Sequence, residues 1–498
     1  MTRITKIDLN HFRAFYGQHT IDLTGNFRDP ATGQRRTVIK NLLVYGENGS
    51  GKSSLRLALD LILASFPEKL PFTNYRNIFA QPNTDGHTNG HIKITLSNND
   101  GTGKSTHTWS ETQFDTAADV IKEANKTKGI LSYRNLFEVY FDQPKDGKIN
   151  IFDLLLTKIL ANFVNRMTNQ TLGAEWQSLC AKIPQNRGHV TVIEKFQDEL
   201  SQFTDQIKLC LQELESKASD ILREFTETVA SQLQFDGLTY NSVQKQINGQ
   251  NIALSVKLLN QDINSPHQLL NEAKLSAIAL SLYLASLLVS SSSSLKILVL
   301  DDILIGLDMS NRIPFIKVIQ NYFIPEDYQI FMLTYDKAWY NIARQALGHQ
   351  SPDWLYLEFF YGLFDGFEVP VINEGQGYLE KAERFFGQHD YKASAIYLRT
   401  ELEVILKKFC QKKGLAVRYK DNPKDLTVDD FWKPIKEYTI RDDHGTLVPL
   451  VDEEQIERFE RGLRLVLNPL SHSRDADTYR QEVEEAIQTV TDLKRRLT

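Results

Sequence analysis

The chain has 498 residues and a mass of 57.1 kDa, which at roughly 150 residues per domain indicates about three structural units. Hydrophobic residues make up 41% and charged residues 24%, a balance typical of a folded protein and not of a disordered or fibrous one. The net charge is -6, so no global positive field attracts nucleic acid, and any such contact would need a local basic patch.

Cysteine usage and hydropathy favour a cytoplasmic protein. Cys180, Cys210 and Cys410 lie far apart and form neither a metal-binding pair nor an even disulfide framework, which fits a reducing compartment. The segment 1–12 alternates like a strand and lacks the pattern of a signal peptide. The most apolar stretch, 275–289, is shorter than the roughly 20 residues of a membrane span. We therefore expect a cytoplasmic location without a membrane anchor.

The N-terminal part alternates between strand and helix patterns. Strand patterns occupy residues 4–23 and the apolar run 41–45, and a helical pattern begins at Leu55. Two further strand patterns, 91–96 and 105–110, flank a polar Asn-Asn-Asp-Gly turn. This spacing predicts a β-hairpin.

A helical middle precedes a second group of strands. A helix is predicted over 154–164, and apolar residues at steps of three and four predict a long amphipathic helix over 196–229. The long helix either packs on its own domain or forms a protruding hairpin for a partner. Further strands are predicted over 252–258, 295–300 and 328–333, and a helix over 275–288; beyond residue 350 the pattern is helical.

A phosphate-binding loop follows the strand 41–45. Residues 46–53 fit the pattern GxxxxGK[ST] between a strand and a helix. Glycines let backbone N–H groups point at phosphate oxygens, and the helix N-terminus adds its positive dipole. Lys52 would then contact the β- and γ-phosphates, and the Ser53 hydroxyl would bind Mg²⁺. We therefore predict ATP and Mg²⁺ as cofactors, with ATP bound by Gly46, Asn48, Gly49, Ser50, Gly51, Lys52, Ser53 and Ser54.

Two acids end the apolar strand pattern near residue 300. In a P-loop enzyme the acid at this strand end holds the water shell of Mg²⁺, which assigns Asp301 to the metal. The next acid, Asp302, can polarise the attacking water as a general base. Asp302 and Lys52 are therefore the predicted catalytic residues.

The order of these motifs resembles the SMC/RecF-type branch of the ABC ATPases. The resemblance rests on 9–15 (LNHFRAF), the loop 46–53, the helical insertion, 300–302 (LDD) and 306–308 (GLD), and it covers about two-thirds of the chain. It implies an α/β fold, an ABC-type P-loop ATPase core with a short helical insertion plus an all-α C-terminal domain. The expected segments are a Walker A lobe (1–150), the insertion (151–245), a second lobe (246–350) and a HEPN-like domain (351–498).

By this resemblance, two subunits close around ATP and share each site. The family signature LSGGQ corresponds to residues 270–274, where Asn271 replaces the phosphate-contacting serine, Glu272 replaces a glycine, and Lys274 ends the motif. Asn271 can still donate a hydrogen bond to a phosphate. Glu272 would repel a phosphate unless its side chain turned away, which predicts weak or partner-assisted closure.

The resemblance assigns the remaining roles at the ATP site. Asp308 would form the D-loop, Tyr335 would take the switch position, and Arg13 would approach the nucleotide. Tyr335 is a poor proton carrier near neutral pH, and Asp302 is shorter than the usual glutamate, so slow turnover is expected. The Q-loop is open between the segment 132–134 and Gln143, which follows the predicted strand 137–141; we include Gln143 with Ser53 and Asp301 as a metal ligand.

The C-terminal region resembles HEPN domains, small helical modules that include metal-independent ribonucleases. Arg464 and His472 are separated by seven residues, one more than the active HEPN pattern allows. Arg399 and Glu403, one helical turn apart, could instead join His472 as a nuclease site or belong to a degenerate scaffold. Ten basic and five acidic residues within 378–420 give a local charge of +5, either a nucleic-acid patch or a solvated helix face.

The layout resembles ATPases of bacterial anti-phage defence, of the Septu or retron-associated kind. It implies an ATP-driven homodimer or higher oligomer that senses infection and controls a nuclease, usually a separate protein. Three alternatives stay open: a RecF/SMC-like DNA repair ATPase, an ATP-gated ribonuclease acting on tRNA, and a scaffold locked by bound nucleotide.

Overall fold

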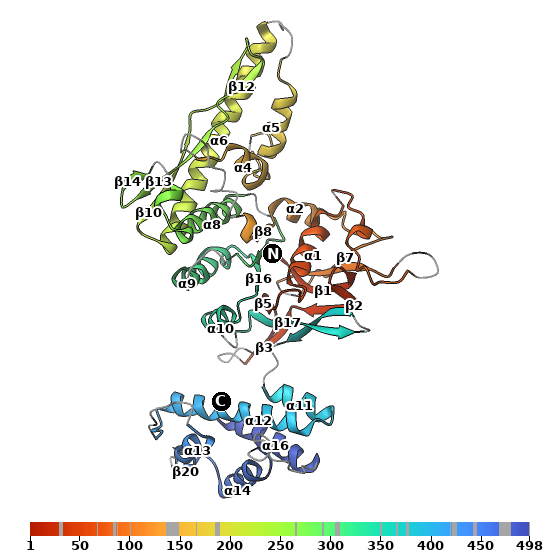
Figure 1. The fold of residues 1–498 in the computed structure, drawn as a ribbon, viewed down its shortest axis with the longest axis vertical. Helices are drawn as coiled ribbons and strands as arrows, with labels where there is room; N and C mark the ends of the chain where they lie inside the picture. Colours follow the sequence, from red (N-terminus) through yellow and green to blue (C-terminus); the bar gives the residue numbers. More distant parts are fainter. Residues whose placement is uncertain are drawn as a thin grey trace. The chain divides into compact units, whose positions relative to one another are not determined.

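The computed structural model forms two compact units, Met1–Glu374 and Gly375–Thr498 (Figure 1). It describes residues 1–28, 33–66, 68–82, 86, 88–99, 101–135, 149–165, 167–184, 190–263, 266–290, 293–303, 309–348, 351–364, 367–374, 378–418, 420, 426–441, 446–467 and 480–497. The expected α/β core with a helical C-terminal region is confirmed.

A six-stranded sheet forms the centre of the first unit. Its order is β18-β17-β5-β16-β15-β8, and all neighbours pair in parallel except the edge strand β18. The strands are β5 (Asn41–Gly46), β8 (Gly129–Ser132), β15 (Ile297–Asp301), β16 (Gln329–Thr334), β17 (Trp354–Phe364) and β18 (Phe367–Glu374). β5, β15 and β16 are continuous apolar runs because both of their faces are covered.

A four-stranded antiparallel sheet lies over one face of this central sheet, with order β2-β1-β6-β7. Helix α1 shares one hydrophobic cluster with both sheets, so the helix is held between them. The predicted hairpin is confirmed as β6–β7. The sheet strands are β1 (Thr2–Phe12), β2 (Phe15–Asp22), β6 (His91–Asn98) and β7 (Ser105–Ser110), and the helices are α1 (Lys52–Ala64), η1 (Phe72–Tyr75) and α2 (Asp119–Thr127). Strands β3 (Thr24–Arg28) and β4 (Arg35–Ile39) form a separate two-stranded sheet.

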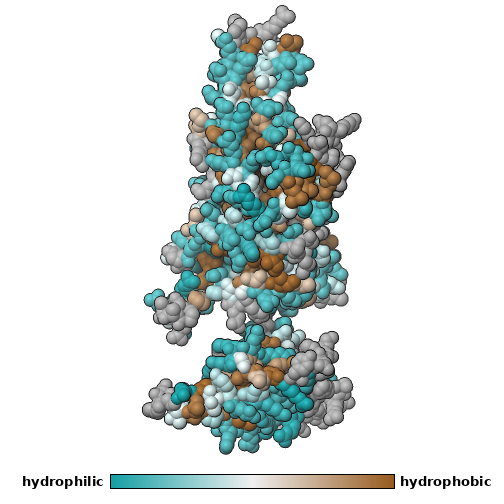
Figure 2. All heavy atoms as spheres, turned by 90° about the vertical axis from the view of Figure 1, so that its left-hand side faces the viewer, coloured by the Kyte–Doolittle hydropathy of each residue, from teal (hydrophilic) through white to brown (hydrophobic). Residues whose placement is uncertain are grey.

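Helices and the inserted segment cover the opposite face and share a second hydrophobic cluster. The helices are α8 (Glu272–Val289), α9 (Met309–Val318), η3 (Ile319–Phe323) and α10 (Lys337–Ala346). Helix α8 has the length and hydropathy of a membrane span, yet it packs inside the unit with most of its residues buried. On the face drawn in Figure 2, hydrophobic residues form separate patches among hydrophilic ones.

The inserted segment combines helices with strands. Its elements are β9 (Ile149–Asn150), α4 (Phe152–Leu154), η2 (Leu155–Ile159), α5 (Leu172–Ala181), α6 (Val190–Phe225), β10 (Val229–Phe235), β11 (Thr239–Asn241), β12 (Gln246–Asn248), β13 (Ile252–Leu258), β14 (Gln261–Ile263) and α7 (Pro266–Leu269). The long helix α6 packs its apolar face on its own unit, as one of the two interpretations expected. The helix predicted over 154–164 is shorter in the structure than expected: its last turn, η2, ends at Ile159.

Two expected segment boundaries differ from the structure. Residue 246 lies within the hairpin β11–β12, and β13 pairs with both β10 and β9, so strands from both sides of that boundary form one sheet. The segment from residue 351 begins with strands β17 and β18, which join the central sheet beside β5. The helical unit therefore begins after β18.

The C-terminal unit is a helical bundle with a short hairpin. Its elements are α11 (Tyr378–Gly387), α12 (Tyr391–Lys413), α13 (Val428–Lys436), β19 (Thr439–Arg441), β20 (Leu447–Pro449), α14 (Glu453–Gly462), η5 (Leu463–Leu467) and α16 (Arg480–Leu497). Asp390 caps α12 at its N-terminus, and Gly414 ends it in the left-handed conformation that glycine adopts most easily. Apolar residues of all these helices share one core.

A buried glutamine joins the two sheets of the first unit and generates a stability prediction. Gln329 is fully buried; its Oε1 accepts a hydrogen bond from the Ile4 N–H at 2.8 Å, and its Nε2 donates to Ile4 O and Lys40 O at 2.8 and 3.0 Å. Gln329→Leu leaves these buried backbone groups without partners. We expect the free energy of unfolding, measured with urea, to fall by about 2–4 kcal/mol.

The matched control is Gln261→Leu, because Gln261 is exposed on β14. We expect its effect to stay within about 0.5 kcal/mol. Equal stability of the two variants would show that Gln329 does not hold the sheets together.

Candidate functional site

The predicted phosphate loop connects β5 to α1. Gly49 and Gly51 have φ angles of 85° and 95°, in the left-handed region that glycine tolerates. A Cβ added to Gly51 would lie 2.8 Å from Pro370 Cγ and 3.3 Å from Phe15 Cζ. The loop is therefore held between β2 and β18 and leaves no room for a side chain at Gly51.

Lys52, the first residue of α1, folds back over the loop. Its Nζ donates hydrogen bonds to Gly46 O at 2.6 Å and to Glu47 O at 3.1 Å. Burial lowers the pKa of Lys52, whereas the negative charges of Asp302 and Asp301 raise it. The ammonium group thus lies at the phosphate loop and near both acids, where it can neutralise a bound phosphate.

Asp301 ends β15 with its carboxylate buried. Its Oδ2 accepts a hydrogen bond from Arg56 Nε at 3.0 Å. Its Oδ1 has no hydrogen-bond partner in the described part of the chain, and neither has the buried Ser50 Oγ in the loop. Unpartnered buried polar atoms are rare, and these two fit a phosphate and hydrated Mg²⁺, which supply both donors and acceptors.

Asp302 takes an unusual backbone conformation at the same strand end. Its φ is 53°, in the left-handed region that costs a residue with a Cβ about 1–2 kcal/mol. Two contacts hold it there: its N–H donates to Leu333 O at 3.0 Å, and its Oδ1 accepts from the Tyr335 N–H at 2.9 Å. Burial raises its pKa, while the Tyr335 hydrogen bond and the charge of Lys52 oppose this shift. A raised carboxylate pKa suits a general base.

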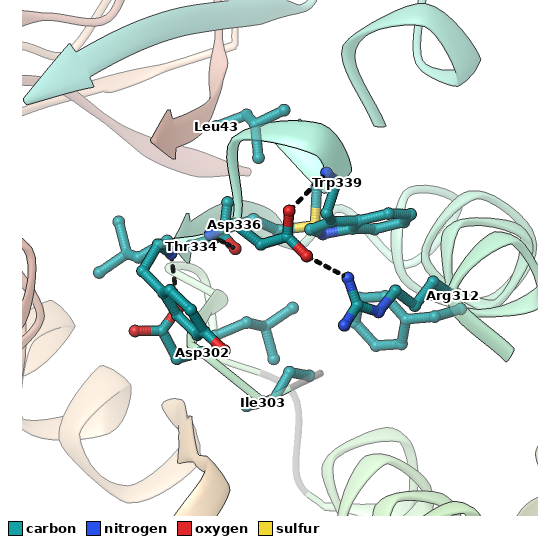
Figure 3. Close-up of a pocket in the computed structure, with 12 residues that line it drawn as sticks. Leu43, Asp302, Ile303, Arg312, Thr334, Asp336 and Trp339 are labelled. Atoms are coloured by element: carbon teal, nitrogen blue, oxygen red, sulfur yellow. Dashed lines mark hydrogen bonds and ion pairs between the residues drawn. The ribbon is translucent and has the colours of Figure 1, made fainter. Parts of the chain in front are cut away.

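Tyr335 follows β16 on the exposed side of this site, with 46% of its surface exposed. The next residue, Asp336, caps α10 by accepting from the Trp339 N–H at 3.0 Å, and it pairs with Arg312 of α9 at 2.5 Å. Figure 3 shows the Trp339 N–H and the Arg312 guanidinium directed at the Asp336 carboxylate. These residues line a cavity of about 20 Å³. Burial alone raises the pKa of Asp336, but these hydrogen bonds hold it below its usual value.

Arg13, the residue predicted from the LNHFRAF segment, lies in the turn between β1 and β2. Arg13 has a φ of 48°; its N–H donates to Tyr75 O at 2.9 Å, and its carbonyl accepts from Asn77 Nδ2 at 2.6 Å. The side chain of Arg13 is exposed. The backbone of this turn is therefore fixed, and a contact between Arg13 and nucleotide stays a prediction.

The predicted signature lies at the start of α8. Asn271 is the N-cap residue, and its Oδ1 accepts a hydrogen bond from the Lys274 N–H at 3.0 Å. The helix begins at Glu272, so Glu272 and Lys274 belong to its first turn and not to a loop before it. Asn271 and Glu272 are exposed at a helix N-terminus, where backbone N–H groups favour an anion.

Several predicted residues lie outside the described part of the chain: Gln143 with the strand 137–141, Asp308, and His472. The other Q-loop candidate is described. Ser132 ends β8 directly beside Asp301, and both its N–H and its Oγ donate to Asn135 Oδ1.

Sequence reasoning missed Arg56, the partner of Asp301. The available signal was spacing, because a residue four positions after Lys52 lies on the same face of α1 as the lysine.

In the C-terminal unit, Arg399 and Glu403 are paired on α12. Arg399 Nε lies 3.4 Å from Glu403 Oε1, and Lys407 Nζ lies 3.7 Å from Glu403 Oε2. Phe409, which lies within the basic segment 378–420, is buried in the core of this unit.

The comparisons with known proteins agree with the phosphate loop. The profile of the AAA domain family matches residues 6–271, a little over half of the chain. The chain belongs to the AAA domain family. No curated protein matches this AAA protein.

Similar solved structures are SMC head domains. One, from Pyrococcus furiosus, has an extended coiled coil and is bound to the C-terminal domain of ScpA; it is 12% identical, covers 78% of this chain and 99% of its own, and has a TM-score of 0.40. An SmcHead bound to the C-winged helix domain of ScpA is 11% identical, covers 76% of this chain and 99% of its own, and has a TM-score of 0.36. The SMC head domain from Thermotoga maritima is 12% identical, covers 75% of this chain and 99% of its own, and has a TM-score of 0.33.

The geometry at Gly51 generates a prediction for nucleotide binding. Gly51→Ala adds a Cβ at a φ of 95° and against Pro370, so the loop has to shift away from the phosphate position. We expect affinity for Mg²⁺-ATP, measured by isothermal titration calorimetry, to fall at least tenfold, about 1.4 kcal/mol.

Gly414→Ala is the matched control. Gly414 also has a left-handed φ, 62°, but nothing lies within 4 Å of its added Cβ. It should lower the stability of the C-terminal unit and leave ATP affinity unchanged. Wild-type affinity in Gly51→Ala would contradict the assignment of this loop.

Proposed function

We propose that this AAA protein is an ATPase that dimerises around ATP and acts as a slow switch. The observation that carries the proposal is one edge of the central sheet, where the phosphate loop, the two acids and Tyr335 lie at the carboxyl ends of neighbouring parallel strands. Ligand sites of parallel sheets lie at this edge.

Each residue at this edge has a chemical role in the proposal. Lys52 and the loop N–H groups hold the phosphates, and Ser53 and Asp301 hold Mg²⁺, directly and through water. Bound Mg²⁺ supplies positive charge at the β- and γ-phosphates. Asp302 orients the attacking water and accepts its proton.

The exposed start of α8 supports the proposed dimer. Asn271, Glu272 and Lys274 form a helix N-terminus that can meet the γ-phosphate bound by a second copy. In the proposal, each of two ATP sites takes Lys52 from one subunit and Asn271 from the other, with Asp308 at the interface. The acid Glu272 beside a phosphate opposes closure, so closure is weak and depends on ATP.

The biological use of the switch rests on its resemblance to anti-phage ATPases. We propose that the closed dimer controls a separate nuclease. A RecF/SMC-like role in DNA repair is the rival, and it predicts stimulation of ATP hydrolysis by duplex DNA. The defence role is supported if duplex DNA leaves the rate of ATP hydrolysis unchanged and if a nuclease encoded beside the gene co-purifies with the protein.

Two variants test the ATPase cycle. Lys52→Ala should abolish ATP binding. Asp302→Asn should bind ATP, hydrolyse it at least about a hundredfold more slowly, and accumulate as an ATP-bound dimer in sedimentation experiments. The matched control is Asp236→Asn, an exposed acid between β10 and β11, which should behave as wild type. Asp302→Asn that stays monomeric with saturating Mg²⁺-ATP would refute the dimerising switch.

An intrinsic ribonuclease is the second candidate, favoured by the contact between Arg399 and Glu403. If His472 completes that site, His472→Ala should remove both the toxicity of the expressed protein and any cleaved tRNA, while ATP hydrolysis stays intact. RNA sequencing of induced cells measures this. Equal cleavage in the wild type and His472→Ala eliminates the candidate.

A further inference from the structure

An arginine of the Walker A helix contacts the acid that we assign to Mg²⁺. Arg56 lies one helical turn after Lys52 on α1, and its Nε is 3.0 Å from Asp301 Oδ2. The Asp301 side chain is 8% exposed and that of Arg56 is 26% exposed. The contact joins α1 to the end of β15, two elements of one hydrophobic cluster, so it is held by packing on both sides.

Arg56 is the cation that contacts Asp301 among the ion pairs of the described residues. Lys52 is near enough to affect the acids electrostatically, but its Nζ hydrogen-bonds to the loop carbonyls of Gly46 and Glu47. The second carboxylate oxygen, Oδ1, is buried without a partner in the described part of the chain. One oxygen of Asp301 is therefore held by an arginine and the other is free for a ligand.

Charge compensation explains the arrangement. Asp301 and Asp302 are adjacent acids, largely shielded from water. A buried carboxylate without a cationic partner is costly, and here it would also repel an incoming triphosphate. The Arg56 contact reduces both costs and fixes the orientation of the carboxylate.

We infer that Arg56 is a built-in counter-ion and positioning residue for Asp301. In this role Arg56 sets how strongly ATP binding depends on Mg²⁺. This inference rests on the proposed function and adds a regulatory residue to its site. With Arg56 present, Asp301 is compensated before Mg²⁺ arrives, so nucleotide affinity depends less on the metal. Without Arg56, the full charge of Asp301 faces the phosphates until Mg²⁺ neutralises it.

The experiment compares the affinity for ATPγS with Mg²⁺ and with EDTA, by isothermal titration calorimetry on the full chain. The measured quantity is the dissociation constant with EDTA divided by the dissociation constant with Mg²⁺. We expect Arg56→Gln to raise this ratio at least tenfold, and Arg56→Lys, which keeps the charge, to stay closer to the wild type. Arg223→Gln is the matched control, because Arg223 forms an exposed ion pair with Asp220 on α6. An unchanged ratio in Arg56→Gln overturns the inference.

A second measurement separates this role from a loss of folding. Thermal unfolding of nucleotide-free Arg56→Gln, Asp301→Asn and the double variant forms a double-mutant cycle. We expect Arg56→Gln to lower the melting temperature and the added Asp301→Asn to recover part of the loss, because the uncompensated charge is then removed. Additive effects would show that the two side chains do not interact, which also overturns the inference.

Failure of the proposed function has a different signature. If the wild type binds ATPγS neither with Mg²⁺ nor with EDTA, the site is not a nucleotide site. Both the proposed function and the role of Arg56 in nucleotide binding are then wrong. If the wild type binds and only the ratio in Arg56→Gln is unchanged, the ATPase proposal stands and the inference about Arg56 alone is wrong.

Discussion

Parallel pairing of β5, β16 and β15 is the constraint on which the rest of the site depends. Tyr45 lies opposite Thr334, and Leu333 lies opposite Asp301, so the three strands reach the same edge of the sheet. Parallel strands are joined by long crossovers, which is why residues so far apart in sequence arrive together. Asp301 is the last residue of β15, and the phosphate loop, Asp302 and Tyr335 come directly after β5, β15 and β16.

Placing several charges at one sheet edge has an energetic cost, and the structure reduces that cost by pairing them. Arg56 neutralises Asp301, and Arg312 neutralises Asp336. Asp302 is stabilised mainly by a backbone N–H, and burial raises its pKa. It is therefore the acid of the site with the weakest compensation, which agrees with its proposed role as general base.

The local parts of this architecture could be predicted from the sequence, and the long-range parts could not. The loop 46–53, the hairpin β6–β7 and helix α6 could each be predicted because the motif, turn or apolar spacing that identifies them lies within one continuous segment. Strands β17 and β18 were missed because they follow the last ATPase motif, and their place in the sheet depends on pairing with remote strands: β17 pairs with β5, and β18 pairs with β17. The insertion was expected to be helical because α6 dominates its periodicity, whereas β9, β10 and β13 pair across distant segments. Arg56 was missed because its partner is remote in sequence.

The central claim is that each ATP site is shared between two copies of the chain. Mixing two inactive variants tests it most directly, because a shared site can be rebuilt in a mixed dimer. Lys52→Ala removes the phosphate lysine, and Lys274→Glu reverses a charge in the first turn of α8 without touching the Asn271 cap. If each site takes Lys52 from one subunit and the start of α8 from the other, a mixed dimer contains one intact site, and ATP hydrolysis reappears on mixing. Hydrolysis that stays at background in a verified mixed dimer would show that the two elements do not act across an interface.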